Sequence, residues 1–199
     1  MKEEAFSMAK KAFEIEAQAI KDTKEAMDWE AFEKAVVLLS RANKIATSGC
    51  GHSGIACRHF AHSMCCIERP ARFIAPGEAL HGGSGFLQAG DVFVAASRGG
   101  KTAELIPMIE IARKKNVSVI TITENLDSAM ARLSDVVLPM SIKKEADRGN
   151  LQGTSSFVAL SAVFDALQVA TIEETGFCGE LQFGLIHPGG AVGQKLNKS

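Results

Sequence analysis

Residues 44–54 read KIATSGCGHSG, a short apolar run followed by a turn with three glycines. The run has the length of a strand, and we expect one over Lys44–Ser48. The glycine-rich turn leads directly into a helix that we expect over Gly54–Ile67. A strand that passes through such a turn into a helix indicates the beginning of an alternating α/β unit.

The same alternation continues along the chain. Four further apolar runs predict strands over Ala71–Ala75, Val92–Ser97, Val117–Thr123 and Val136–Met140. Helices are expected over Ala103–Lys115, Asp127–Leu133 and Thr154–Thr175. Apolar strands separated by helices indicate a parallel sheet that is covered on both faces. The predicted fold class is therefore α/β, with a doubly wound, five-stranded parallel sheet in a flavodoxin-like three-layer sandwich.

Two further helices are expected before the first strand, because apolar residues around Phe13 and again around Phe32 recur at helical spacing. We find no internal repeat or low-complexity linker. The expected organisation is one domain over residues 1–199, with N-terminal helices in residues 1–42. Residues 43–199 then form the α/β core and a short C-terminal tail.

Composition excludes several classes of partner. Lys and Arg total 22 and Asp and Glu total 23, for a formal net charge of −1, and no basic run is present. This balance argues against nucleic-acid and membrane-surface binding. Apolar runs such as Asp91–Ser97 are far shorter than the roughly 20 residues of a membrane span. Five cysteines without a disulfide-rich pattern indicate reduced thiols, so we expect a cytoplasmic protein.

The first glycine-rich turn is a candidate anion site. In open parallel sheets ligands bind beyond the carboxyl ends of the strands, where this turn lies. The backbone at Gly51 and His52, the Ser53 hydroxyl and the start of the next helix could together hold a phosphate. A dinucleotide loop is an alternative, but the glycine spacing fits that fingerprint only loosely.

A second turn of the same kind follows the strand over Val92–Ser97. It contains Ser97, Arg98, Gly100 and Thr102, and it also leads into a helix. Each turn alone is equally well explained as a helix cap. Two of them in one small sheet favour a shared phosphate site.

Six motifs in order resemble those of the SIS (sugar isomerase) domain, and within it the D-arabinose 5-phosphate isomerases of Kdo biosynthesis. The most specific is the closing His-Pro-Gly-Gly-Ala-x-Gly motif. The matching segments are Gly49–Gly54, Pro76–Gly82, Ser97–Thr102 with Glu104, Glu145-Ala146, Thr154–Ser156 and His187–Gly193.

This chain departs from the family pattern at several positions. The family's lysine is replaced by His52, its asparagine by Arg98, and its serine hydroxyl is lost at Gly99. Ala75 replaces a histidine, and an acidic residue is missing at Gly83. Arg98 could offset the missing lysine, since a guanidinium suits phosphate. Many relatives continue into paired CBS domains, and we expect the catalytic domain alone here.

The resemblance implies an aldose–ketose isomerase that interconverts D-ribulose 5-phosphate and D-arabinose 5-phosphate through an enediol. It also implies a supply to Kdo, lipopolysaccharide or capsule biosynthesis. The matching ionisable residues are Glu104 and Glu145, of which one would be the enediol base, and His187 and His81 for ring opening and oxygen protonation. This chemistry requires no cofactor and no metal.

A histidine- and cysteine-rich helix is the remaining candidate metal site. Its possible ligands are Cys57, His59, His62, Cys65 and Cys66. A helix packed on the sheet explains the same residues, and a closed zinc site usually draws ligands from more than one element. We therefore expect no metal there.

Two alternatives to the isomerase stay open from the sequence. One is a non-catalytic sugar-phosphate-binding module, and the other is an isomerase of a hexulose or heptose phosphate. The resemblance also implies a homotetramer, a dimer of dimers, in which His187 reaches a neighbouring subunit. The apolar N-terminal helices fit such self-association.

Overall fold

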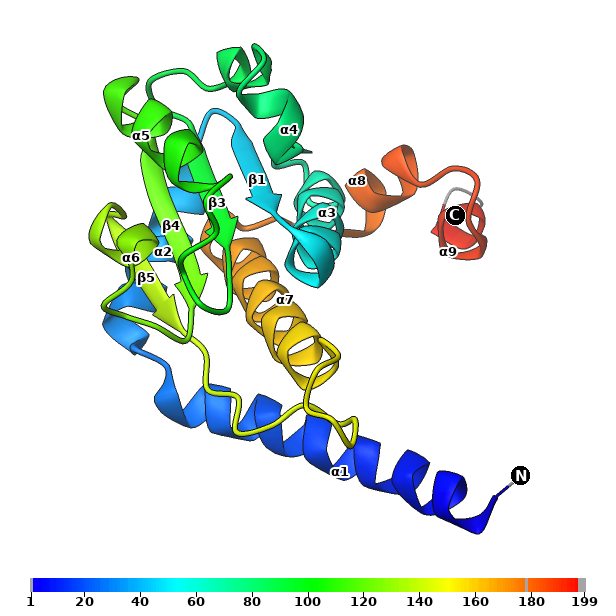
Figure 1. The fold of residues 1–199 in the computed structure, drawn as a ribbon. Coiled ribbons are helices and arrows are strands. Elements are labelled where there is room, and N and C mark those ends of the chain that lie inside the picture. The colour runs from blue at the N-terminus through cyan, green and yellow to red at the C-terminus, as the bar shows by residue number, and fades with distance from the viewer. Residues whose placement is uncertain (1, 178, 197–199) are drawn as a thin grey trace.

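The computed structural model describes residues 2–177 and 179–196 of the 199-residue chain (Figure 1). Its centre is a five-stranded, fully parallel sheet in the order β2-β1-β3-β4-β5. The strands are β1 (Ile45–Gly49), β2 (Ala71–Phe73), β3 (Val92–Ala96), β4 (Ser118–Thr123) and β5 (Val136–Pro139). This order and the flanking helices confirm the predicted doubly wound α/β sheet.

Helices cover both faces of the sheet, and the pleat decides which strand residues meet them. On β3, Val92, Val94 and Ala96 join a buried cluster with α2 (Trp29–Arg41), α3 (Gly51–Cys65) and α7 (Ser155–Thr175). Phe93 and Ala95 point to the other face. There they pack with α4 (Pro76–Ala79), η1 (Gly83–Phe86), α5 (Ile106–Lys114) and α6 (Ala129–Arg132).

The outermost helix, α1 (Glu3–Ala26), packs on α7, and its N-terminal half projects beyond the rest of the molecule (Figure 1). Only Ala19, Asp22 and Thr23 of α1 are buried, all near its C-terminal end. By length and composition α7 could cross a membrane. Its buried Leu160, Phe164 and Leu167 instead belong to the core cluster.

Two segments differ from the sequence-based expectation. The helix expected from Ala103 begins at Ile106, because residues 103–105 form a turn in which Leu105 N–H donates to Thr102 O (3.1 Å). Pro107 then occupies the first helical turn, where its missing N–H costs nothing. The C-terminal tail contains two short helices, α8 (Gly179–Ile186) and α9 (Ala191–Leu196).

Candidate active site

The turn after β1 brings the start of α3 close to the end of the strand. A Cβ at Gly54 would lie 2.5 Å from the Gly49 carbonyl oxygen, so the close approach requires glycine. Helix α3 begins at Gly51, three residues earlier than expected, which places His52 and Ser53 in its first turn. The first amides of a helix lack partners within it and favour an anion. This turn therefore has the geometry expected of a phosphate site.

An open groove of about 710 Å³ lies at this helix start. It is lined by the β1–α3 turn, by the segment that follows β2 and by Glu104. The lining residues are Gly49, Cys50, Gly51, His52, Gly54, Ile55, Arg58, Phe73, Ala75, Pro76, Gly77 and Glu104. The groove thus lies beyond the carboxyl ends of neighbouring parallel strands, where such folds bind ligands.

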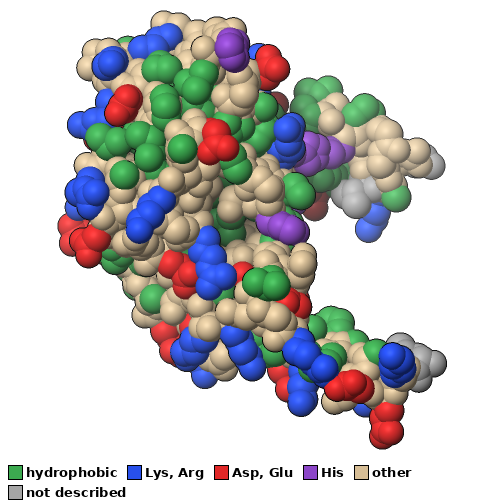
Figure 2. Space-filling model, viewed as in Figure 1, with side chains coloured by type: hydrophobic (Ala, Val, Ile, Leu, Met, Phe, Trp, Pro, Cys, Tyr) green, Lys and Arg blue, Asp and Glu red, His purple; other side chains and the backbone are tan. Residues whose placement is uncertain are grey.

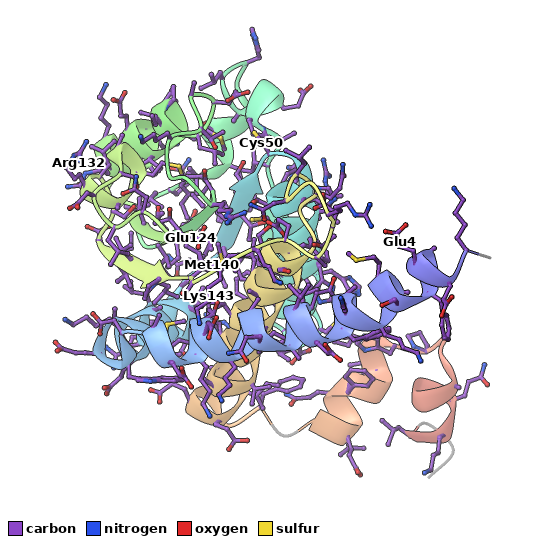
Figure 3. All side chains as sticks on the ribbon, turned by 60° about the horizontal axis from the view of Figure 1, so that its bottom comes forward. Glu4, Cys50, Glu124, Arg132, Met140 and Lys143 are labelled. Atoms are coloured by element: carbon purple, nitrogen blue, oxygen red, sulfur yellow. The ribbon has the colours of Figure 1, made fainter. Side chains whose placement is uncertain are left out.

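Glu104 faces this groove from the turn that precedes α5 and is exposed. The expectation that Glu104 lies in the first turn of a helix is wrong, because α5 begins two residues later. Burial, and to a smaller extent the negative charge of Glu104, raises the pKa of the Cys50 thiol. The Glu104 carboxylate is therefore within electrostatic reach of Cys50, which Figure 3 labels near the start of α3.

The turn after β3 is held closed by its own hydroxyls. Ser97 Oγ and Thr102 Oγ1 are 2.8 Å apart, and Gly100 N–H donates to Ser97 Oγ (3.1 Å). Gly100 has a φ of +62° and packs against the buried Ser128. Two hydroxyls and a glycine amide are therefore grouped in this turn. The strand before it, β3, pairs with β1, which precedes the first glycine-rich turn.

We expect Gly100→Ala to destabilise the protein by about 2–5 kcal/mol, which combines a left-handed backbone with overpacking. A Cβ there would lie 2.1 Å from Ser128 Oγ, which accepts a hydrogen bond from Ala131 N–H at the start of α6. Gly99→Ala is the matched control, since a Cβ at Gly99 meets nothing within 4 Å. Urea unfolding of both variants measures the difference, and equal stabilities would contradict this account of the turn.

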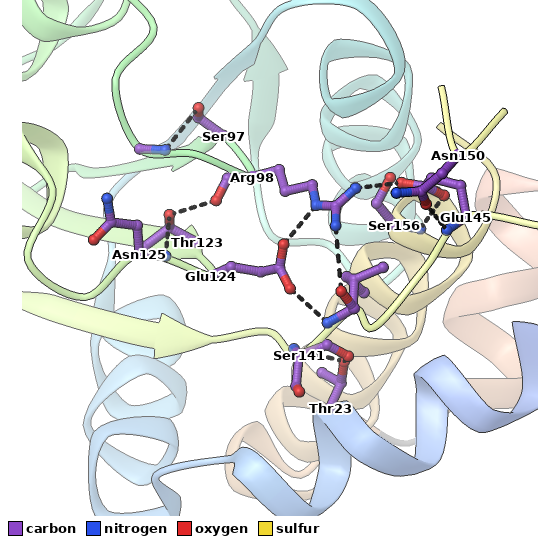
Figure 4. A network of polar contacts seen from close by, with 12 residues as sticks. Thr23, Ser97, Arg98, Thr123, Glu124, Asn125, Ser141, Glu145, Asn150 and Ser156 are labelled. Carbon is purple, nitrogen blue, oxygen red and sulfur yellow. Dashed lines mark hydrogen bonds and ion pairs between the residues drawn. The ribbon is translucent and has the colours of Figure 1, made fainter. Parts of the chain in front are cut away.

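Arg98 takes part in a network of ion pairs behind this turn (Figure 4). Its Nε donates to Glu124 Oε2 (2.5 Å), its Nη1 to Glu145 Oε1 (2.7 Å) and its Nη2 to the Ile142 carbonyl oxygen (3.2 Å). Three of the five guanidinium N–H groups are thus used within the chain. Contact of Arg98 with a substrate phosphate stays a prediction.

Glu145 is buried, with 3% of its side chain exposed. Its Oε2 accepts hydrogen bonds from Thr154 Oγ1 (3.2 Å) and from Ser156 N–H (3.1 Å) at the start of α7. Burial acts to raise the pKa of Glu145, but the bonds from Ser156, the charge of Arg98 and the bond from Thr154 together lower it. These contacts favour the ionised form of Glu145, which lies buried in the segment between β5 and α7.

The two histidines predicted on these loops, His52 and His81, have different surroundings. The ring of His52 packs edge-on against Phe157 (6.2 Å between centroids), and a Cβ at Gly153 would lie 3.1 Å from it. His81 is exposed in the turn after α4, where its backbone N–H donates to the Glu78 carbonyl oxygen (3.1 Å). His52 lines the groove, and His81 is not among the lining residues described.

His187 follows the end of α8. Its Nδ1 lies 3.1 Å from the Phe183 carbonyl oxygen, and its ring stacks on that of Phe183 with 3.8 Å between centroids. Figure 1 shows α8 and α9 standing off the main body on the side of α3. Within one chain, His187 is not among the described residues that line the groove.

Sequence reasoning missed the cation of the groove, Arg58, whose guanidinium lies 3.9 Å from the centre of the Phe73 ring. Helical periodicity could have found it, because Arg58 is four residues after Gly54 and shares its face of α3. Glu124 was also missed, although it directly follows β4. Among residues 2–177 and 179–196, no group of three His, Cys, Asp or Glu side chains could hold a metal ion.

Comparison with known protein families matches the SIS domain model over residues 38–170. The arabinose 5-phosphate isomerase KdsD of Francisella tularensis is 34% identical over 94% of this chain and 58% of that protein. The KdsD of Escherichia coli K12 is 39% identical over 77% of this chain and 46% of that protein. The chain therefore spans about half the length of these curated relatives.

Two solved structures match over their full length. A Listeria monocytogenes protein, named provisionally as a sugar-phosphate isomerase, is 38% identical with a TM-score of 0.90 over 95% of this chain and 100% of that one. An Escherichia coli CFT073 protein in complex with A5P is 27% identical with a TM-score of 0.87, over 94% of this chain and 100% of that one. From the matching model, the sheet order and these similarities together, the chain belongs to the SIS domain family.

Proposed function

We propose that this protein is an aldose–ketose isomerase that interconverts D-ribulose 5-phosphate and D-arabinose 5-phosphate. The observation that carries the proposal is the groove, in which the Glu104 carboxylate faces the start of α3. A helix start that suits phosphate and a carboxylate base in one groove suit a phosphorylated sugar. The names of the curated relatives and the A5P complex of a similar structure support this choice of sugar.

In the proposed mechanism the turns after β1 and β3 bind the phosphate, with Gly51, Ser53, Ser97 and Thr102 as donors. Glu104 removes the proton from C2 of the open-chain aldose while O1 is protonated, which gives an enediol. Return of a proton to C1 and loss of one from O2 completes the ketose. His81 and His187 manage ring opening and the protonation of oxygen, and correctly placed groups of this kind typically contribute about 10²–10⁴-fold each.

The proposal places this reaction in the cytoplasm, as a source of D-arabinose 5-phosphate for Kdo, lipopolysaccharide or capsule biosynthesis. The near-neutral charge supports a small-molecule substrate rather than a nucleic-acid partner. The KdsD name of the relatives supports the pathway.

We further propose a homotetramer, a dimer of dimers, in which His187 completes the groove of a partner subunit. The support is its position directly after the projecting helix α8, which ends at Ile186. Large hydrophobic side chains are exposed on the two projecting parts, with Phe13 at 79% on α1 and Leu181 and Leu185 at 85% and 73% on α8. Figure 2 shows hydrophobic side chains on both parts and open space between them. Exposed apolar surface of this kind favours association.

A non-catalytic sugar-phosphate-binding module is the second candidate. The observation that favours it is the pairing of Glu145 with Arg98, which removes one of the four ionisable candidates from free contact with a substrate. Glu104 remains exposed in the groove, and this favours the enzyme.

The test is a coupled assay of the chelator-treated protein against pentulose, hexulose and heptulose phosphates. We expect turnover of D-ribulose 5-phosphate at the highest kcat/KM. Saturable binding of D-arabinose 5-phosphate without turnover of any substrate would establish the binding module instead. A higher kcat/KM for a hexulose or heptulose phosphate would overturn the assignment of the sugar.

A further inference from the structure

The network of Arg98, Glu124 and Glu145 has a role that the proposed mechanism leaves unassigned (Figure 4). We propose that Arg98 is a positioning residue, which acts through Glu145 to fix the start of α7 against the turn after β3. The inference rests on the proposed function and assigns Glu145 to this structural pair, so that Glu104 alone is the enediol base.

The first argument is the place of Arg98 between three loops. Its own turn follows β3, Glu124 follows β4, and Ile142 and Glu145 follow β5. Two further hydrogen bonds join the same segments. The Glu124 N–H donates to Arg98 O (3.0 Å), and the Ile142 N–H donates to Glu124 Oε1 (2.5 Å). One guanidinium therefore joins the carboxyl ends of three adjacent strands.

The second argument is that both carboxylate oxygens of Glu145 already accept hydrogen bonds within the chain. Arg98 takes Oε1, and the Thr154 hydroxyl and Ser156 N–H take Oε2. The backbone N–H of Glu145 donates to Asn150 Oδ1 (2.6 Å), which fixes the loop around it. A general base must reach its proton within hydrogen-bond distance, and a buried carboxylate that accepts three bonds is poorly placed to do so. Its contacts instead suit an anchor for the start of α7.

The third argument connects this pair to the groove. Arg98 lies between Ser97, whose hydroxyl meets Thr102, and Gly100, whose amide donates to Ser97. On the other side, the segment that Glu145 anchors carries Gly153, which packs against the ring of His52 in the groove. Loss of the ion pair would let both turns shift, and small misplacements of binding groups are costly in catalysis.

The charges also predict how substitutions combine. If Arg98 is removed, the buried carboxylate of Glu145 stays as an uncompensated charge, whereas removal of both partners is far less harmful. Residues that act as one unit show strongly non-additive effects. A phosphate ligand that acts independently of Glu145 would instead show additive losses.

The experiment is a double-mutant cycle of Arg98→Gln, Glu145→Gln and the double variant, with Arg98→Lys as the milder change. The readouts are kcat/KM for D-arabinose 5-phosphate, the affinity for inorganic phosphate, and Tm. Arg113→Gln is the matched control, because Arg113 pairs with Asp135 at 3.3 Å on the surface, with both side chains 47% exposed. The Arg113→Gln variant should change none of the three readouts, since exposed ion pairs contribute little to stability.

We expect each single variant to lower kcat/KM by roughly 10- to 100-fold and Tm by roughly 6–20 °C. The double variant should be no worse than the worse single one in either readout. Arg98→Lys should fall between wild type and Arg98→Gln, because it keeps the charge and loses the fork.

Three results would overturn the proposal. Additive losses in kcat/KM and in phosphate affinity would make Arg98 an independent ligand. Loss of turnover in Glu145→Gln with near-normal turnover in Arg98→Gln would make Glu145 the base. A lower Tm with unchanged kcat/KM would reduce the pair to stability alone. If the wild-type protein turns over no sugar phosphate, the proposed function fails, and non-additivity in Tm and phosphate affinity still decides the role of the pair.

Discussion

Glu104→Gln lowers kcat for D-arabinose 5-phosphate by roughly 100- to 10,000-fold, the range typical of a general base. The amide keeps the size of the side chain but cannot accept a proton from C2. KM should change little, because the turns after β1 and β3 bind the phosphate in both ground state and transition state. Steady-state kinetics with a coupled assay measure both constants.

Glu110→Gln is the control for this substitution. Glu110 is an exposed carboxylate on α5, on the helix that follows the Glu104 turn, and it does not line the groove. Its variant should retain wild-type kinetics. Turnover of Glu104→Gln within a few-fold of wild type would move the base to another residue.

His187→Ala should be nearly inactive alone, yet it should complement inactive Glu104→Ala when the two proteins are mixed under conditions that exchange subunits. If His187 acts on a partner's groove, an exchanged dimer contains one groove with both residues intact. Random exchange at equal concentrations would then restore about a quarter of the sites. The physical reason is that His187 directly follows α8, a helix that stands off its own chain's body.

Mass-tagged subunits would verify that exchange has occurred. Mixing His187→Ala with itself after the same treatment is the control, and it should recover nothing. Absence of recovery despite proven exchange, or a monomer by light scattering, would contradict action across an interface.

Local patterns were sufficient for the inner strands, because β1, β3 and all but the first residue of β4 are buried. The edge strand β2 is only partly buried and is shorter than the expected Ala71–Ala75. The strand expected over Val92–Ser97 is observed as Val92–Ala96, and the long helix expected from Thr154 begins at Ser155. The start of α5 was missed by three residues, since the Thr102–Leu105 turn and Pro107 decide it rather than apolar spacing.

The contacts of the site were harder to predict, because they join residues far apart in the chain. Arg98 read as a phosphate ligand from its turn alone, and nothing local shows that Glu124 and Glu145 lie beside it. Those contacts arise because parallel strands bring their carboxyl ends to one edge of the sheet. Likewise, no sequence pattern fixes where the end of α8 places His187.

The most direct test of the central claim, proton transfer from C2 of a sugar phosphate in the Glu104 groove, is nuclear magnetic resonance of D-arabinose 5-phosphate with the protein in D₂O. The account predicts D-ribulose 5-phosphate that carries solvent deuterium at C1 after repeated turnover, and at least roughly 100-fold slower incorporation with Glu104→Gln. Bound but unchanged aldose with the wild-type protein, or incorporation at the wild-type rate with Glu104→Gln, would contradict it.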